Sequence, residues 1–149
     1  MKQQLVIDNI KTALAAITTT NGYYSNIGTK VTEGKQNPFG ENRLDGVDVL
    51  DGDDEMMMIT EDEAIEAHTL QVSIKTIAKS PLTPQVARKQ IADVRKAMKS
   101  LKNDAVWLEN VTRWVNTKNT FEIEQEGLKI IGTESLFAVE YNTLELEED

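Results

Sequence analysis

Residues 68–102 read HTLQVSIKTIAKSPLTPQVARKQIADVRKAMKSLK and join two different hydrophobic periodicities. From His68 to Ala78 apolar residues alternate with polar ones, which predicts a strand with one buried face. Ser80-Pro81 is expected to end this strand. Thr83 then supplies an N-cap and Pro84 the first position of a helix. The apolar stripe of this helix consists of Ala87, Ile91, Val94, Met98 and Leu101.

A second amphipathic helix is predicted from Lys2 to Thr18, where apolar residues recur at helical spacing. Asn21-Gly22 follows it as a left-handed stop signal. The segment from Tyr23 to Leu44 is irregular in pattern, and Gly28 to Glu33 could form a short edge strand within it. Three aromatic residues of this segment are expected either to fold back onto the domain or to anchor a neighbouring subunit. They are Tyr23, Tyr24 and Phe39.

An acidic segment precedes the central strand. Val47 and Val49 alternate with acids, and Asp51-Gly52 separates them from the apolar run Met56 to Thr60. Asp-Gly between two such runs predicts a hairpin with a tight turn. The three methionines of this run, residues 56–58, are expected to place one or two side chains in the core. An adaptable contact surface is the alternative.

Three further strand-like pieces follow the second helix, at Val111 to Thr117, Thr120 to Glu124 and Leu128 to Thr143. Residues 144–149 form an acidic tail that is expected to fray. Trp107 and Trp114 suit either a core or an interface. The order of elements predicts one α+β domain over residues 1–149, with an antiparallel or mixed sheet and two main helices packed on it.

Charge is distributed unevenly along the 149 residues, whose net charge is −9. Residues 41–66 carry eleven acids against one base, Arg43, whereas residues 84–102 carry six bases and one acid, Asp93. Two patches of opposite sign suit oriented docking to a partner, with a merely solvated surface as the alternative. The negative total argues against specific nucleic-acid binding, which depends on Lys and Arg contacts to phosphate.

The chain has no cysteine, so disulfides and thiolate chemistry are excluded, and the simplest compartment is the cytoplasm. No stretch approaches the roughly 20 apolar residues of a membrane helix. The residues after Met1 do not read as a signal peptide, because Asp8 and Asn9 break the apolar run.

Sequence motifs for catalysis, phosphate binding and metal binding are mostly missing. His68 is the only histidine, and neither a nucleophile elbow nor a phosphate-cradling glycine loop is present. The run Asp51-Gly-Asp-Asp-Glu55 starts like a calcium loop, but Met56 and Asp62 stand where that loop needs Gly and Glu. Loose divalent binding is the alternative to a solvated hairpin tip. We therefore expect a non-enzymatic protein without cofactor or metal.

One segment carries a family resemblance. AAITTTNGYYSNIGTKVTEG, residues 15–34, lies directly behind the first helix, and DGVDVLDG, residues 45–52, forms the acidic turn. FAVEYNT, residues 137–143, has the pattern of a closing strand. Together these resemble, over most of the chain, the tail-terminator and minor tail proteins of long-tailed bacteriophages, the group that includes the tail protein U of lambda-like phages.

The resemblance implies an α+β subunit that forms a ring, commonly a hexamer, at the head-proximal end of the tail tube. Such a ring stops tube polymerisation and joins the tail to the head. The implied partners are copies of itself, the tail tube protein and head-completion or connector proteins. The implied location is the virion, after assembly in the host cytoplasm.

A ring needs two different patches on each subunit. The acidic residues Asp51, Asp53 and Asp54 are one candidate patch. The basic helix surface at Arg88, Arg95 and Lys96 of the next subunit is the other candidate, by charge alone. Acidic segments converging on the ring axis would repel each other, and salt or magnesium would relieve that repulsion. The rivals are a stand-alone acidic regulator that binds a basic partner and, third, an enzyme with a carboxylate-only site.

Overall fold

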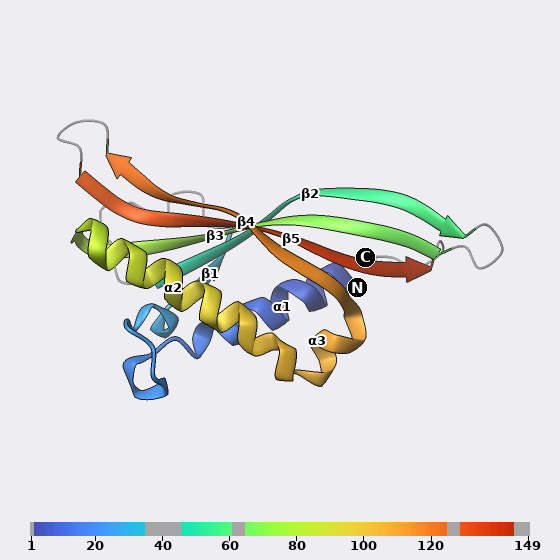
Figure 1. The fold of residues 1–149 in the computed structure, drawn as a ribbon, viewed down its shortest axis with the longest axis horizontal. Helices are drawn as coiled ribbons and strands as arrows, with labels where there is room; N and C mark the ends of the chain where they lie inside the picture. The colour runs from blue at the N-terminus through green and yellow to red at the C-terminus, as the bar shows by residue number, and fades with distance from the viewer. Residues whose placement is uncertain (1, 35–45, 61–64, 125–128, 145–149) are drawn as a thin grey trace.

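One mixed sheet of five strands organises the molecule (Figure 1). The computed structural model describes residues 2–34, 46–60, 65–124 and 129–144. The strands are β1 (Val31–Glu33), β2 (Gly46–Thr60), β3 (Ile65–Leu82), β4 (Val111–Glu124) and β5 (Lys129–Leu144), in the spatial order β1-β2-β3-β5-β4. Only the short β1 pairs in parallel, with β2, and every other pair is antiparallel. The expected α+β class with a mixed sheet is confirmed.

Three α-helices lie on one face of this sheet (Figure 1). They are α1 (Lys2–Ala15), α2 (Pro84–Ser100) and the short α3 (Ala105–Asn110). Three single 3-10 turns connect the elements: η1 (Thr19–Asn21), η2 (Ile27–Thr29) and η3 (Leu101–Asn103). The core is the layer between these helices and the sheet, and its largest side chains include Phe137 and Tyr141 of β5.

Both main helices form as their periodicity predicts. The apolar residues of α1 other than Leu5 and Ala15 are buried, and the chain turns back at Gly22, which adopts a left-handed φ of 87°. Thr83 caps α2, because its hydroxyl oxygen accepts a hydrogen bond from the amide of Val86 at 3.2 Å. Of the apolar stripe predicted for α2, only Ile91 is half-buried rather than buried.

Ser80-Pro81 does not end β3, which continues to Leu82. The pairing with β5 is interrupted between Ile77 and Leu82 and then resumes at the pair Leu82–Ile130. A proline cannot donate a backbone hydrogen bond, so it is tolerated where the ladder is already irregular. The expectation for this boundary was therefore wrong by a few residues.

Asp51-Gly52 does not form a hairpin turn, because it lies inside the continuous strand β2. Asp51 pairs with Val72 and Asp54 with Leu70, so two residues of β2, Gly52 and Asp53, oppose the single residue Gln71. This is a β-bulge, and it changes the face of the sheet toward which each following side chain of β2 points. The predicted edge strand is confirmed in part, since β1 begins only at Val31, after a 3-10 turn.

The strands of the C-terminal half are longer and less interrupted than their sequence pattern predicts. The pieces at residues 111–117 and 120–124 form one strand, β4, and α3 was not predicted at all. Leu144 is the last residue of β5 rather than the first of the tail, and residues 145–149 lie outside the described residues. Trp107 belongs to the core, and Trp114 packs against it with its ring 5.6 Å from that of Phe137.

The sheet is longer than the helix layer that covers it. The end of β2, the start of β3 and the end of β5 project past α1 and α3 (Figure 1, right). We call this part, residues 53–60, 65–69 and 140–144, the arm. Met56 and Met57 lie here with exposed fractions of 64% and 70%, so neither enters the core, and the side chain of Met58 lies outside the description.

Candidate functional site

The two faces of the sheet differ in the arm. His68 and Tyr141 are paired across β3 and β5, and both are buried on the helix side. Because side chains alternate along a strand, their neighbours point to the opposite, uncovered face. On that face, the register places Met57 beside Ala67 and Ala67 beside Asn142. Glu55, Thr69 and Glu140 form the adjacent row.

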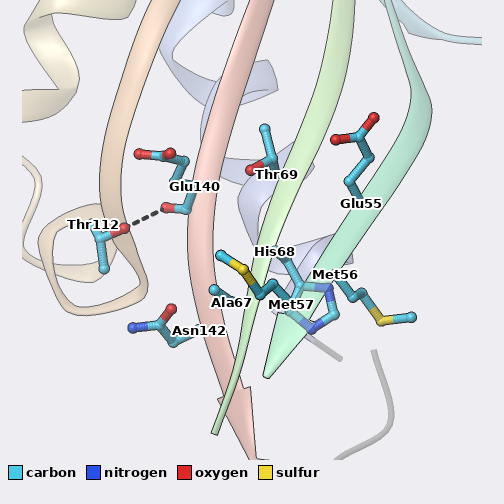
Figure 2. Close-up of a pocket in the computed structure, with 9 residues that line it drawn as sticks. All are labelled: Glu55, Met56, Met57, Ala67, His68, Thr69, Thr112, Glu140 and Asn142. Carbon is cyan, nitrogen blue, oxygen red and sulfur yellow. Dashed lines mark hydrogen bonds between the residues drawn. The ribbon is translucent and has the colours of Figure 1, made fainter. Parts of the chain in front are cut away.

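A hollow of about 600 Å³ is bordered by these residues, together with Thr112 of β4 and with Met56 and His68, whose register places them on the helix side (Figure 2). Its lining consists of Glu55, Met56, Met57, Ala67, His68, Thr69, Thr112, Glu140 and Asn142. Ala67 is the smallest side chain in this lining, and the side chain of Met57 lies near it (Figure 2). The hydroxyl of Thr112 donates to the backbone oxygen of Glu140 at 3.0 Å, which joins β4 to the rim.

The hollow is acidic. Glu55 is exposed and makes no ion pair with the residues that the structure describes. Glu140 is half-buried, and its carboxylate lies 3.4 Å from Nε of Arg113. No lysine or arginine contributes to the lining itself. The hollow therefore combines the apolar side chains of Met57 and Ala67 with the carboxylate of Glu55, which has no ion-pair partner among the described residues.

A buried polar network lies behind this hollow. Nδ1 of His68 is 2.9 Å from Oδ2 of Asp54, and its Nε2 is 2.8 Å from the hydroxyl of Thr143. The ring of Tyr141 stacks on the imidazole at a centroid distance of 4.7 Å, and its hydroxyl is 3.4 Å from Asp54. Since Asp54, His68 and Thr143 belong to β2, β3 and β5, the network links all three strands of the arm.

A carboxylate, an imidazole and a hydroxyl in this order resemble the relay of a hydrolase. However, His68 and Thr143 are exposed by only 2% and 5%, so the hydroxyl is closed to a substrate in this structure. A nucleophile has to reach the reacting atom. The arrangement instead satisfies buried polar groups at the base of a projecting arm, where a hydrophobic core is thin.

The predicted acidic group is divided by the fold. Asp51 accepts a hydrogen bond from Nε2 of Gln3 at 2.6 Å, and Asp54 faces His68. Asp53 lies in the bulge and is exposed. Within the described ranges, no group of three or more His, Cys, Asp or Glu side chains is arranged to hold a metal ion. Of the three predicted acids, only Asp53 has its side chain in solvent.

The basic residues of α2 form a stripe on its outer face. Its exposed members are Arg88, Lys89, Arg95, Lys96 and Lys99. Lys96 has two partners within the domain, because its Nζ donates to the backbone oxygen of Gly22 at 2.9 Å and lies 4.7 Å from the ring centroid of Tyr23. Arg88 and Arg95 have exposed side chains, as an interface role requires.

The two tyrosines beside α2 behave differently. Tyr23 folds back and packs against the core. Burial raises the pKa of its phenol, the nearby negative charge of Asp93 raises that pKa further, and a hydrogen bond with Ser100 acts in the opposite direction. Tyr24 points outward with 67% of its surface exposed, and Nζ of Lys89 lies 5.7 Å from its ring centroid. Phe39 lies outside the described residues.

Asp93 is the residue that sequence reasoning missed. It is 1% exposed, and its two oxygens accept from the amides of Tyr24 and Ser25, each at 2.9 Å. The hydroxyl of Ser25 donates to it as well, at 2.6 Å. Asp93 is the only acid of α2, which carries five bases, and that anomaly is the one signal in the sequence that could have marked it.

The acidic hollow and the basic stripe remain separate within one chain. Among the residues that the structure describes, no ion pair joins the arm to α2. Within the residues that the structure describes, no helix is long and apolar enough to cross a membrane. A comparison with protein-family models and with curated proteins found no match for this chain.

Proposed function

We propose that this chain is a structural subunit that assembles with copies of itself, as the ring that closes the tail tube of a long-tailed bacteriophage. The observation that carries the assembly role is the pair Met56 and Met57. They are neighbours in one strand, point to opposite faces, and are both more than half exposed. Exposed apolar side chains on both faces of a projecting arm favour burial by a partner.

The identity of the assembly rests on the resemblance. The segments at residues 15–34, 45–52 and 137–143 resemble tail-terminator and minor tail proteins, and an α+β subunit is what that resemblance implies. In this proposal the ring contacts the tail tube protein on one side and head-completion or connector proteins on the other. It works without catalysis, cofactor or specific nucleic-acid binding, and its place is the virion.

The ring requires a head-to-tail contact between two different surfaces of each subunit. The arm and the outer face of α2 are such surfaces, because they lie on different elements and carry opposite charge. Electrostatic attraction of this kind sets the orientation and the rate of association more than its strength. Burial of the methionines supplies the larger part of the affinity.

Light scattering after size-exclusion chromatography, followed by electron microscopy, tests the proposal. We expect a closed ring of about six copies whose population grows with protein concentration. Replacing both Met56 and Met57 by Gln is expected to dissociate the ring without unfolding the subunit. Leu108→Gln is the matched control, since Leu108 is 60% exposed on α3 and does not line the hollow. A wild-type protein that stays monomeric at every concentration contradicts the proposal.

A stand-alone acidic regulator is the second candidate, and one observation favours it. Asp53 and Glu55 are exposed on the arm and would suit a basic partner protein. Such a regulator is monomeric or dimeric by itself, and it binds a basic enzyme through the arm. The same light-scattering measurement separates the two functions, because only the assembly subunit forms a larger ring from one chain type.

A further inference from the structure

Tyr24 is presented to solvent by a rigid support. Its backbone amide and that of Ser25 are held by the carboxylate of Asp93, which is almost completely buried in α2. The side chain nevertheless points outward, and Nζ of Lys89 lies 5.7 Å from its ring centroid. An aromatic side chain on a fixed backbone loses little conformational entropy on binding, which is why tyrosines serve as interface anchors.

The hollow in the arm has the chemistry to receive an aromatic ring. Its volume of about 600 Å³ lies within the range of roughly 300–1,000 Å³ that is usual for ligand-binding pockets. The small side chain of Ala67 leaves room for a flat group, and the sulfur of Met57 offers a favourable contact to a ring edge. The amide of Asn142 and the hydroxyl of Thr69 are polar groups within reach of a phenol (Figure 2).

The charges around the two features are complementary. Lys89 lies beside Tyr24, with its Nζ 5.7 Å from the ring centroid, and its exposed sequence neighbour Arg88 adds a second positive charge to this half of α2. The hollow is flanked by Glu55, which makes no ion pair within the described part of the chain. Because Lys89 lies beside Tyr24 and Glu55 lines the hollow, entry of Tyr24 into the hollow would place positive charge of α2 near this carboxylate.

We propose that the hollow of one copy receives Tyr24 of a second copy, with Arg88 and Lys89 of that second copy facing Glu55. This inference rests on the proposed function, since it names the contact that would join neighbouring subunits. The donor surface and the acceptor surface lie on different parts of the chain, so each copy offers one of each. Such a contact is heterologous and extends from copy to copy until a ring closes.

A single substitution tests the anchor. Tyr24→Ala is expected to weaken assembly by roughly 30-fold or more in dissociation constant, which is the size of effect found for anchor residues. Tyr24→Phe keeps the ring and should retain most of the affinity. Leu108→Ala removes a similarly exposed apolar side chain from α3 and serves as the matched control. Circular dichroism and thermal unfolding verify that each variant is folded.

A mixing experiment tests the direction of the contact. Ala67→Trp fills the hollow but keeps Tyr24, whereas Tyr24→Ala keeps the hollow but lacks the anchor. Each variant alone is expected to be monomeric, and an equimolar mixture is expected to give a one-to-one dimer that grows no further. Thr69→Trp fills the same hollow from the adjacent row and replaces Ala67→Trp if that variant does not fold.

A charge exchange tests the flanking residues. Glu55→Lys and Arg88→Glu are each expected to weaken assembly several-fold, and the double variant in one chain is expected to recover most of that loss. Glu109→Lys, an exposed acid on α3, is the control for the change in net charge.

Three results bear on the inference. A wild-type ring that persists in Tyr24→Ala overturns the contact but leaves the proposed function standing. Mixed variants that stay monomeric overturn it as well, because a Tyr24-to-hollow contact has to form in that mixture. A wild-type chain that never assembles overturns the proposed function and this contact with it.

Discussion

Oδ2 of Asp54 lies 2.9 Å from Nδ1 of His68, and this contact joins the strand that carries the bulge to the centre of the sheet. A carboxylate only accepts hydrogen bonds, so Nδ1 carries the proton of the imidazole in this contact. Nε2 lies 2.8 Å from the hydroxyl of Thr143 and 3.6 Å from a carboxylate oxygen of Glu66. Both nitrogens of a ring that is almost fully buried are thereby satisfied.

Asp54→Ala should reveal how much this network stabilises the arm. The substitution leaves a buried N–H of His68 without its acceptor, which costs about 1–3 kcal/mol of unfolding free energy. Asp53 is the exposed neighbour in the bulge, and Asp53→Ala should change the free energy of unfolding by less than about 0.5 kcal/mol. Urea unfolding of the two variants makes the comparison. Equal losses would contradict the structural role of the Asp54–His68 contact.

Gly28 and Gly52 should respond differently to the same substitution. A Cβ at Gly28 would lie 2.5 Å from the backbone oxygen of Leu14 and 2.7 Å from the backbone nitrogen of Ile17. Backbone cannot move aside cheaply, so Gly28→Ala should destabilise the fold by about 1–3 kcal/mol. At Gly52 the nearest atom would be 3.8 Å away, which is ordinary contact, and Gly52→Ala should be close to neutral. Thermal or urea unfolding would contradict this if Gly52→Ala were the more harmful change.

The alkaline limit of stability should depend on Tyr23. Burial, and after it the charge of Asp93, raises the folded-state pKa of this phenol above its ordinary value of 10.0. Below pH 10 its contribution to stability is fully present, and it is lost as the pH rises through the folded pKa. Tyr23→Phe removes the ionisation and should make the alkaline decline shallower. Tyr24→Phe, which removes an exposed phenol, is the control in unfolding measured from pH 8 to 12.

Asp93→Ala should affect stability and assembly together. Removing the carboxylate leaves the amides of Tyr24 and Ser25 without acceptors, at a cost of about 1–3 kcal/mol. The Tyr24 anchor then loses its rigid support, so assembly should weaken even though no proposed contact residue has changed. Asp93→Asn keeps one acceptor oxygen and should lie between wild type and Asp93→Ala in both measurements. Asp93→Ala that assembles like wild type would show that the support is not needed.

The parts of the fold that the sequence predicted correctly depend on short-range periodicity. The stripe of α1, the N-cap at Thr83 and the alternation from His68 to Thr76 all arise within a few residues, so no knowledge of distant partners is required. The boundaries that were wrong depend on pairing. Asp-Gly suits a hairpin turn and a bulge alike, and only the partners Leu70 and Val72 on β3 select the bulge.

The candidate site was predictable only in part. Tyr24, Arg88 and Arg95 were chosen for composition and charge, and the structure places all three on the surface. Lys96 and Asp54 were chosen on the same grounds, but they have partners inside the domain. The methionines were expected inside because apolar strands usually are. Whether a helix covers that part of the sheet is set by the length of β2 relative to α1, which no local pattern contains.

The bulge at Gly52-Asp53 also constrains how this chain can vary in length. Before it, Val47 and Val49 lie on the helix side of the sheet, and after it Asp54 and Met56 do, as the partners of the buried Leu70 and His68, so the helix-side positions of β2 change from odd to even numbers. Losing one residue here would exchange the faces of the whole distal strand. Glu55 and Met57 would turn towards the helix side, and the partner of His68 would turn away. Insertions and deletions in this strand are therefore tolerable only in steps of two, whereas a single one would dismantle the network and the hollow at once.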